Sequence, residues 1–120
     1  MGKIIRFEQL EAWQEDHKLV LMLCQATQGY PGEERYGLVA QMRRAAVSIP
    51  ANIAEGFKRR GIQEKIRFYN ISEGSLEELK YFTILSKDLG YLPSNADLMA
   101  QAETAGRLLN GLIASTQRRT

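Results

Sequence analysis

Three short turn sequences divide the chain into four long segments, and this division constrains the fold more than any other feature of the sequence. The turns lie at residues 29–32, 60–61 and 90–95 and are rich in Gly, Pro and polar residues. In the segments at residues 8–28, 34–58, 63–89 and 94 to about 118, apolar residues recur at spacings of three and four. That spacing is the period of an α-helix, so the sequence predicts an all-α protein.

Long helices joined by short connections pack most simply against their neighbours in sequence. The pattern therefore predicts an antiparallel up-down-up-down four-helix bundle. A chain of 120 residues, 44% of them hydrophobic, is large enough to bury a core without disulfides or structural metal. We expect residues 1–120 to form one such domain.

The first predicted helix is apolar on more than one side. One stripe follows the helical period and consists of Leu10, Trp13, His17, Val20, Cys24 and Thr27. A second apolar set, which includes Leu19, Met22 and Leu23, lies on another face. A helix that is apolar on several faces is buried on several faces. We therefore expect part of this surface to contact another subunit.

The second predicted helix contains Pro50, which lacks an amide hydrogen and crowds the carbonyl of Ala46. This predicts a helix that is kinked near Pro50, or one that breaks just before it. Ser48, Asn52 and Glu55 share the side opposite the apolar stripe. Two interpretations of these three residues remain open. They form either a solvated helix face or a polar network at an interface, which would fix the register of the helices.

The third and fourth predicted helices carry recognisable terminal signals. Gly74 weakens the middle of the third segment by about 1 kcal/mol relative to Ala, and Ser75 could begin a second helix there. We expect one continuous helix with Gly90 as its C-terminal cap. Ser94 is the predicted N-cap of the fourth helix.

Positive charge is concentrated in the middle third of the chain. Residues 35–67 carry eight bases and two acids, although the net charge of the whole chain is only +2. A tight connection between the second and third helices would bring most of these bases to one end of the bundle. Such a patch favours a phosphate-bearing or acidic partner. The candidate nucleic-acid-binding residues are Arg43, Arg44, Lys58, Arg59, Arg60, Lys65 and Arg67. The nearby aromatic residues Phe57, Phe68 and Tyr69 could stack on bases.

The sequence predicts no catalytic residues, no metal site and no cofactor, and therefore no enzyme. His17 and Cys24, the single histidine and cysteine, lie about 10 Å apart along a helix, too far for a thiolate–imidazole pair. Phosphate-binding loops and metalloprotease motifs are absent. The lone cysteine and the absence of a signal-peptide pattern predict a cytoplasmic location. The longest apolar run, residues 19–24, is too short to span a membrane.

Residues 38–57, LVAQMRRAAVSIPANIAEGF, are the most specific stretch of the sequence. They resemble the signature of a bacterial four-helix-bundle family. Its members include proteins encoded within intervening sequences of large-subunit ribosomal RNA genes, and the accessory variability determinants of diversity-generating retroelements (Avd-like proteins). Supporting matches lie at residues 7–10 with Trp13, and at residues 36–38, 74–79, 89–92 and 109–113.

The resemblance covers essentially the whole chain and implies a homopentamer. For the retroelement branch it also implies association with a reverse transcriptase and nucleic acid. For the intervening-sequence branch it implies no defined activity. Combined with the charge pattern, it predicts a non-enzymatic, homo-oligomeric accessory protein that binds nucleic acid, RNA in the first place, through basic surface. The alternative is a protein–protein scaffold without a nucleic-acid role, in which the basic patch steers an acidic partner.

Overall fold

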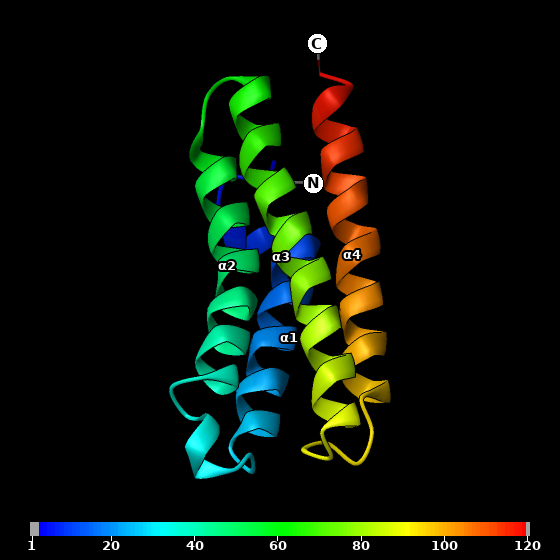
Figure 1. The fold of residues 1–120 in the computed structure, drawn as a ribbon. Coiled ribbons are helices and arrows are strands. Elements are labelled where there is room, and N and C mark those ends of the chain that lie inside the picture. Colours follow the sequence, from blue (N-terminus) through cyan, green and yellow to red (C-terminus); the bar gives the residue numbers. More distant parts are fainter. Residues whose placement is uncertain (1–2, 120) are drawn as a thin grey trace.

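The computed structural model describes residues 3–119, which form four α-helices and no β-strand (Figure 1). The helices are α1 (Glu11–Thr27), α2 (Leu38–Lys58), α3 (Ile62–Asp88) and α4 (Ala96–Gln117), and short 3-10 turns, η1 (Phe7–Gln9) and η2 (Gly32–Glu34), precede α1 and α2. They lie side by side in an elongated bundle of 47 × 24 × 19 Å. The predicted all-α fold with four helices is confirmed. Within residues 3–119, none of the helices has the length and apolar character needed to cross a membrane.

The connections determine which helix ends meet. In Figure 1 the α1–α2 and α3–α4 connections lie at one end of the bundle. The α2–α3 connection lies at the other end, where α4 also finishes. The end of the bundle that carries the α2–α3 connection therefore receives residues from three helices.

The helix α2 runs through Pro50 without a break. Side-chain donors reach the carbonyls just before the proline. Asn52 Nδ2 donates to the Ser48 carbonyl at 2.8 Å, and Ser72 Oγ of α3 donates to the Ile49 carbonyl at 2.8 Å. These side chains add hydrogen bonds to the helix on either side of Ile49. The carbonyl that loses its helical donor to Pro50 is that of Ala46, four residues earlier.

The helix α3 is continuous across Gly74, and Gly90 ends it as predicted. Gly90 has φ +82°, its N–H donates to the Lys87 carbonyl, and the N–H of Tyr91 donates to the Ser86 carbonyl. This is the hydrogen-bond pattern of a Schellman cap, which favours glycine at the left-handed position.

The start of α4 lies slightly later than the sequence suggests. The helix begins at Ala96, and Asn95 occupies the cap position without a side-chain cap. The Ser94 hydroxyl still accepts the N–H of Ala96, at 3.1 Å. Ser94 therefore stabilises the helix start from one residue before the cap.

The buried core consists of two clusters. The large core cluster fills the end near the α1–α2 connection and includes Leu19, Met42 and Leu79. The small core cluster lies toward the α2–α3 connection, and its fully buried members are Ala12, Ile53, Tyr69 and Leu109. Along each helix, one small or polar buried residue separates the two clusters. These four residues are Asp16, Pro50, Ser72 and Ala105.

The core face of α1 lies mainly on the second apolar set, and of the first stripe only Val20 and Thr27 are buried. His17 is exposed and stacks on Trp13, with ring centres 5.0 Å apart and planes at 10°. The residue that enters the core instead is Asp16, whose side chain is fully buried. The second apolar set of the helix, which includes Leu19 and Leu23, supplies the rest of that face. Because the acidic residue Asp16 lies among these apolar residues, the sequence pattern did not identify this side as the core face.

Candidate nucleic-acid interface

Basic side chains from three helix termini meet at the α2–α3 end of the bundle. Lys58 is the last residue of α2, Arg59 and Arg60 form the connection, and Lys65 and Arg67 lie in the first turns of α3. The end of α4 adds Arg118 and Arg119, and Arg119 is close enough to Lys65 to act on its pKa. We call these seven residues the basic end: Lys58, Arg59, Arg60, Lys65, Arg67, Arg118 and Arg119.

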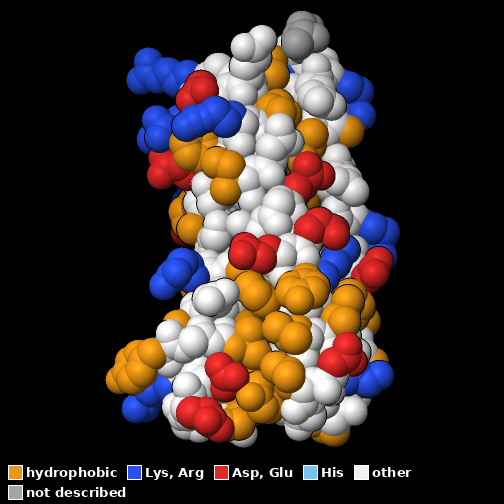
Figure 2. All heavy atoms as spheres, in the orientation of Figure 1, with side chains coloured by type: hydrophobic (Ala, Val, Ile, Leu, Met, Phe, Trp, Pro, Cys, Tyr) orange, Lys and Arg blue, Asp and Glu red, His pale blue; other side chains and the backbone are white. Residues whose placement is uncertain are grey.

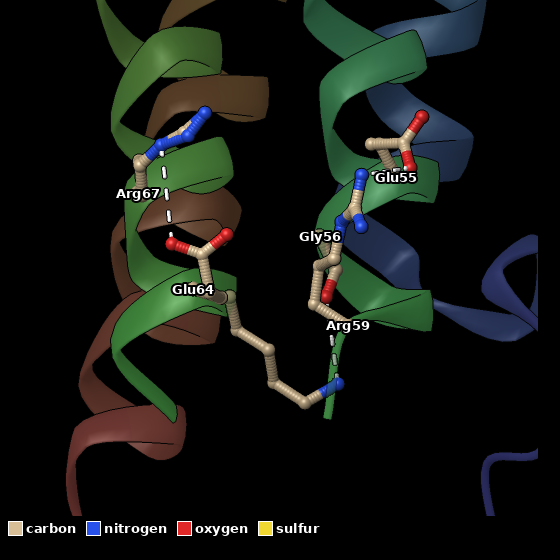
Figure 3. A network of polar contacts seen from close by, with 6 residues as sticks. Glu55, Gly56, Arg59, Glu64 and Arg67 are labelled. Atoms are coloured by element: carbon tan, nitrogen blue, oxygen red, sulfur yellow. Dashed lines mark hydrogen bonds and ion pairs between the residues drawn. The ribbon is translucent and has the colours of Figure 1, made fainter. Parts of the chain in front are cut away.

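Two of these arginines form exposed ion pairs with acids three or four residues earlier in the sequence. Arg59 contacts Glu55 at 2.9 Å, and Arg67 contacts Glu64 at 4.0 Å (Figure 3). Each partner is about half exposed, so these pairs add little to stability and are easily exchanged for another anion.

Lys65 has a structural role at the junction of α2 and α3. Its Nζ donates to the carbonyl of Phe57 at 2.6 Å and approaches that of Gly56 at 3.4 Å. These carbonyls belong to the last turn of α2, so the ammonium group compensates the negative end of the helix dipole. Burial lowers the pKa of Lys65, and the charge of Arg119 lowers it further. Lys65 is therefore less available to an external ligand than its sequence position suggests.

Of the three nearby aromatic residues, one is buried and the other two carry cations over their rings. Tyr69 is buried, and Lys65 Nζ lies 5.3 Å from the centre of the Phe57 ring. The guanidinium carbons of Arg59 and Arg67 lie 4.8 and 5.0 Å from the centre of the Phe68 ring. These cation–π contacts hold the two arginines beside the α2–α3 junction.

Five bases of this end form no ion pair with an acid within residues 3–119: Lys58, Arg60, Lys65, Arg118 and Arg119. Among these five, Lys65 is engaged with the carbonyls of α2. Figure 2 shows Lys and Arg side chains on both sides of the upper part of the molecule, the α2–α3 end in this orientation. The sequence was sufficient to predict that the arginines after α4 join the basic end. In a bundle with alternating helix directions, its C-terminus lies beside the connection between the second and third helices.

The structure does not bring Arg43 and Arg44 to the basic end. They lie in the first half of α2, about 20 Å from Lys58 along the helix. Arg43 faces α1, where its Nε donates to Thr27 Oγ1 at 3.0 Å and its terminal nitrogen donates to the Cys24 carbonyl at 3.1 Å. Arg44 instead lines a groove between α2 and α3.

Ser48 and Asn52 form a polar network between α2 and α3. Ser48 Oγ lies 2.9 Å from Ser75 Oγ, and Asn52 Nδ2 donates to Ser48 Oγ at 3.0 Å. Glu55 lies apart from this network, since it is exposed and pairs with Arg59. The polar side of α2 that the sequence indicates thus faces α3 at Ser48 and Asn52 and solvent at Glu55.

The only fully buried acid in the described chain is one that sequence reasoning missed. Both carboxyl oxygens of Asp16 lack a hydrogen-bond partner. Burial raises the pKa of Asp16 to about 8, and the charge of neighbouring Glu15 adds to the rise. No group of three or more His, Cys, Asp and Glu side chains within residues 3–119 is arranged to hold a metal ion.

The sequence of the chain matches a known protein family. A family model described as 23S rRNA-intervening sequence protein matches residues 8–111. The match includes α1, α2 and α3 and most of α4. No curated protein matches the chain.

Proposed function

Because the chain belongs to the 23S rRNA-intervening sequence protein family, we propose that it is a non-enzymatic protein that binds RNA through its basic end. The observation that supports this proposal is the convergence of seven bases from the termini of α2, α3 and α4. Five of them form no ion pair within residues 3–119, so their positive charge is not neutralised by neighbouring acids.

The arrangement favours recognition of the RNA backbone. Cations already lie over the rings of Phe57 and Phe68, and Tyr69 is buried, so we expect phosphate contacts to contribute more than stacking on bases. Lys58, Arg60 and the arginines after α4 would instead neutralise phosphates, which makes affinity strongly dependent on salt and weakly dependent on sequence.

The test is titration of nuclease-treated protein into labelled RNA at about 50 and 200 mM salt. Replacing Lys58, Arg60 and Arg119 with Gln should weaken binding and reduce the salt slope by about 2, the loss of three phosphate contacts on a single strand. A matched control replaces three exposed bases outside the basic end with Gln: Lys18, Lys87 and Arg107. Equal losses in both triple variants would show non-specific charge attraction. Absence of binding at 50 mM salt would favour the scaffold function instead.

We further propose that the protein acts as a homo-oligomer, with the pentamer implied by the resemblance as the expected state. Support comes from four exposed apolar residues in α3 and at its C-terminal cap: Ile71, Tyr81, Ile84 and Leu89. Figure 2 shows hydrophobic side chains gathered on the lower half of the displayed face, where the C-terminal half of α3 lies. Light scattering after size exclusion should give a mass several times 13.6 kDa, which Tyr81→Glu with Ile84→Glu should reduce. A monomeric wild type would contradict the proposal.

We also propose an order of the helices, a kink in α2 and a cytoplasmic location. The alternating ends of the connections in Figure 1 support an up-down-up-down order. The missing donor at Pro50 supports a kink in α2. A half-buried free thiol at Cys24 fits a cytoplasmic location. Association with a reverse transcriptase, which the resemblance to accessory variability determinants implies, remains a prediction.

A further inference from the structure

A hollow of about 570 Å³ lies beside the α1–α2 connection, at the opposite end of the bundle from the basic end. Its polar and charged lining comes from Thr27, Gln28, Arg35 and Arg43. No acidic residue lines it. The hollow therefore combines space for a small ligand with two guanidinium groups and no compensating negative charge.

Arg43 is held in place by neutral acceptors. Its guanidinium donates to Thr27 Oγ1 at 3.0 Å and to the Cys24 carbonyl at 3.1 Å, and Thr27 Oγ1 in turn donates to the Leu23 carbonyl at 2.9 Å. These contacts use two of the five N–H donors of the guanidinium. The residue is half-buried and forms no ion pair within residues 3–119. A fixed, partly desolvated cation with remaining donors is well suited to bind an anion.

The two acids nearest to the hollow in sequence are directed elsewhere. Glu34 accepts the N–H of Leu38 with one carboxylate oxygen, at 3.2 Å, and the hydroxyl of Tyr91 with the other, at 2.9 Å. That hydrogen bond raises the pKa of Tyr91, and the charges of Glu34 and Glu33 raise it further. Glu34 is thus engaged with Tyr91, and neither acid forms an ion pair with Arg35 or Arg43 within residues 3–119.

We propose that this hollow binds a phosphate group between Arg35 and Arg43. The planar, forked donors of arginine match phosphate oxygens, and two arginines can engage one dianion. A small phosphorylated metabolite and an RNA phosphate share this chemistry. The inference does not rest on the proposed RNA binding, because the hollow lies about 20 Å along α2 from Lys58.

The experiment is NMR of 15N-labelled protein at constant ionic strength, with signals of the backbone and of arginine Nε–H. Inorganic phosphate, 5′-AMP and a short RNA are titrated separately. Saturable shifts centred on Thr27, Gln28, Arg35 and Arg43 with phosphate or AMP are the expected result. If RNA shifts the same signals, the source is a nucleic-acid phosphate. If RNA shifts only the basic end, the source is a small phosphorylated molecule.

Variants make the assignment specific. Arg35→Gln should weaken phosphate binding about tenfold or more, the effect of losing one charge-assisted hydrogen bond. Arg44→Gln is the matched control, because Arg44 follows Arg43 directly on α2 but lines a different groove. It should leave phosphate binding unchanged. Arg43→Gln also removes a contact between α1 and α2, so Arg35→Gln is the decisive variant. Absence of saturable shifts at the hollow, or unchanged affinity in Arg35→Gln, would overturn the proposal.

Discussion

The buried carboxyl of Asp16 should make the stability of this protein fall as the pH rises through neutrality. The side chain is fully buried, and both carboxyl oxygens lack a hydrogen-bond partner. Burial, assisted by the charge of Glu15, raises the pKa from 3.8 to about 8 in the folded chain. Between these two values the folded state holds a proton that the unfolded state has released. The contribution of Asp16 to stability is therefore fully present below about pH 4 and is lost progressively up to about pH 8.

The size of the effect follows from the shift. One pKa unit corresponds to about 1.4 kcal/mol, so raising the pH from 5 to 7 should cost about 3 kcal/mol. That is a large share of the 5–15 kcal/mol that stabilises a typical domain. Asp16→Asn keeps the shape of the side chain and removes its titration, so this pH dependence should disappear in the variant.

The assay is urea unfolding followed by circular dichroism at pH 5, 6 and 7, at one fixed protein concentration. The informative quantity is the difference in slope between wild type and Asp16→Asn, because other acids contribute equally to both. Asp88→Asn, which changes an exposed aspartate, is the control and should keep the wild-type slope. The same slope in wild type and Asp16→Asn would refute the reasoning and show that the carboxyl is ionised in the folded protein.

Four further predictions concern stability and are checked by the same unfolding assay. Gly56→Ala should lower the unfolding free energy by about 1–3 kcal/mol, because the new Cβ would lie 2.7 Å from Tyr69 Cε1. Gly74→Ala, with nothing within 4 Å, should raise it by up to about 1 kcal/mol, and a loss there would show hidden packing. Gly90→Ala should lower it by about 1 kcal/mol because φ is +82°. Lys65→Gln should lower it by about 1 kcal/mol while leaving the salt slope of RNA binding nearly unchanged.

Periodicity and turn chemistry were sufficient to predict most of the fold. Glycine is favoured at the left-handed backbone position that ends a helix, so Gly90 located the end of α3 from sequence. The core face of α1 could not, because the helix has two apolar sets and the correct one contains Asp16. Burial preferences predict that charged residues are exposed. They therefore fail for a carboxyl that is buried as a neutral acid.

The candidate site was predictable only in part. The clustering of Lys58, Arg59 and Arg60 near Lys65 follows from a short connection, which the sequence contains. Lys65 donates to carbonyls at the end of α2, and this contact depends on side-chain geometry that sequence spacing does not determine. The separation of Arg43 from Arg44 has a similar cause, since adjacent residues on a helix point about 100° apart and reach different neighbours.

The division of the core has a consequence for how the bundle opens. The small core cluster, with four fully buried members, supports the basic end, whereas the large core cluster supports the opposite end. Regions that bury less apolar surface unfold locally at lower free energy, and their amides exchange with solvent sooner. The backbone amides of the basic end should therefore exchange sooner than those beside the α1–α2 connection.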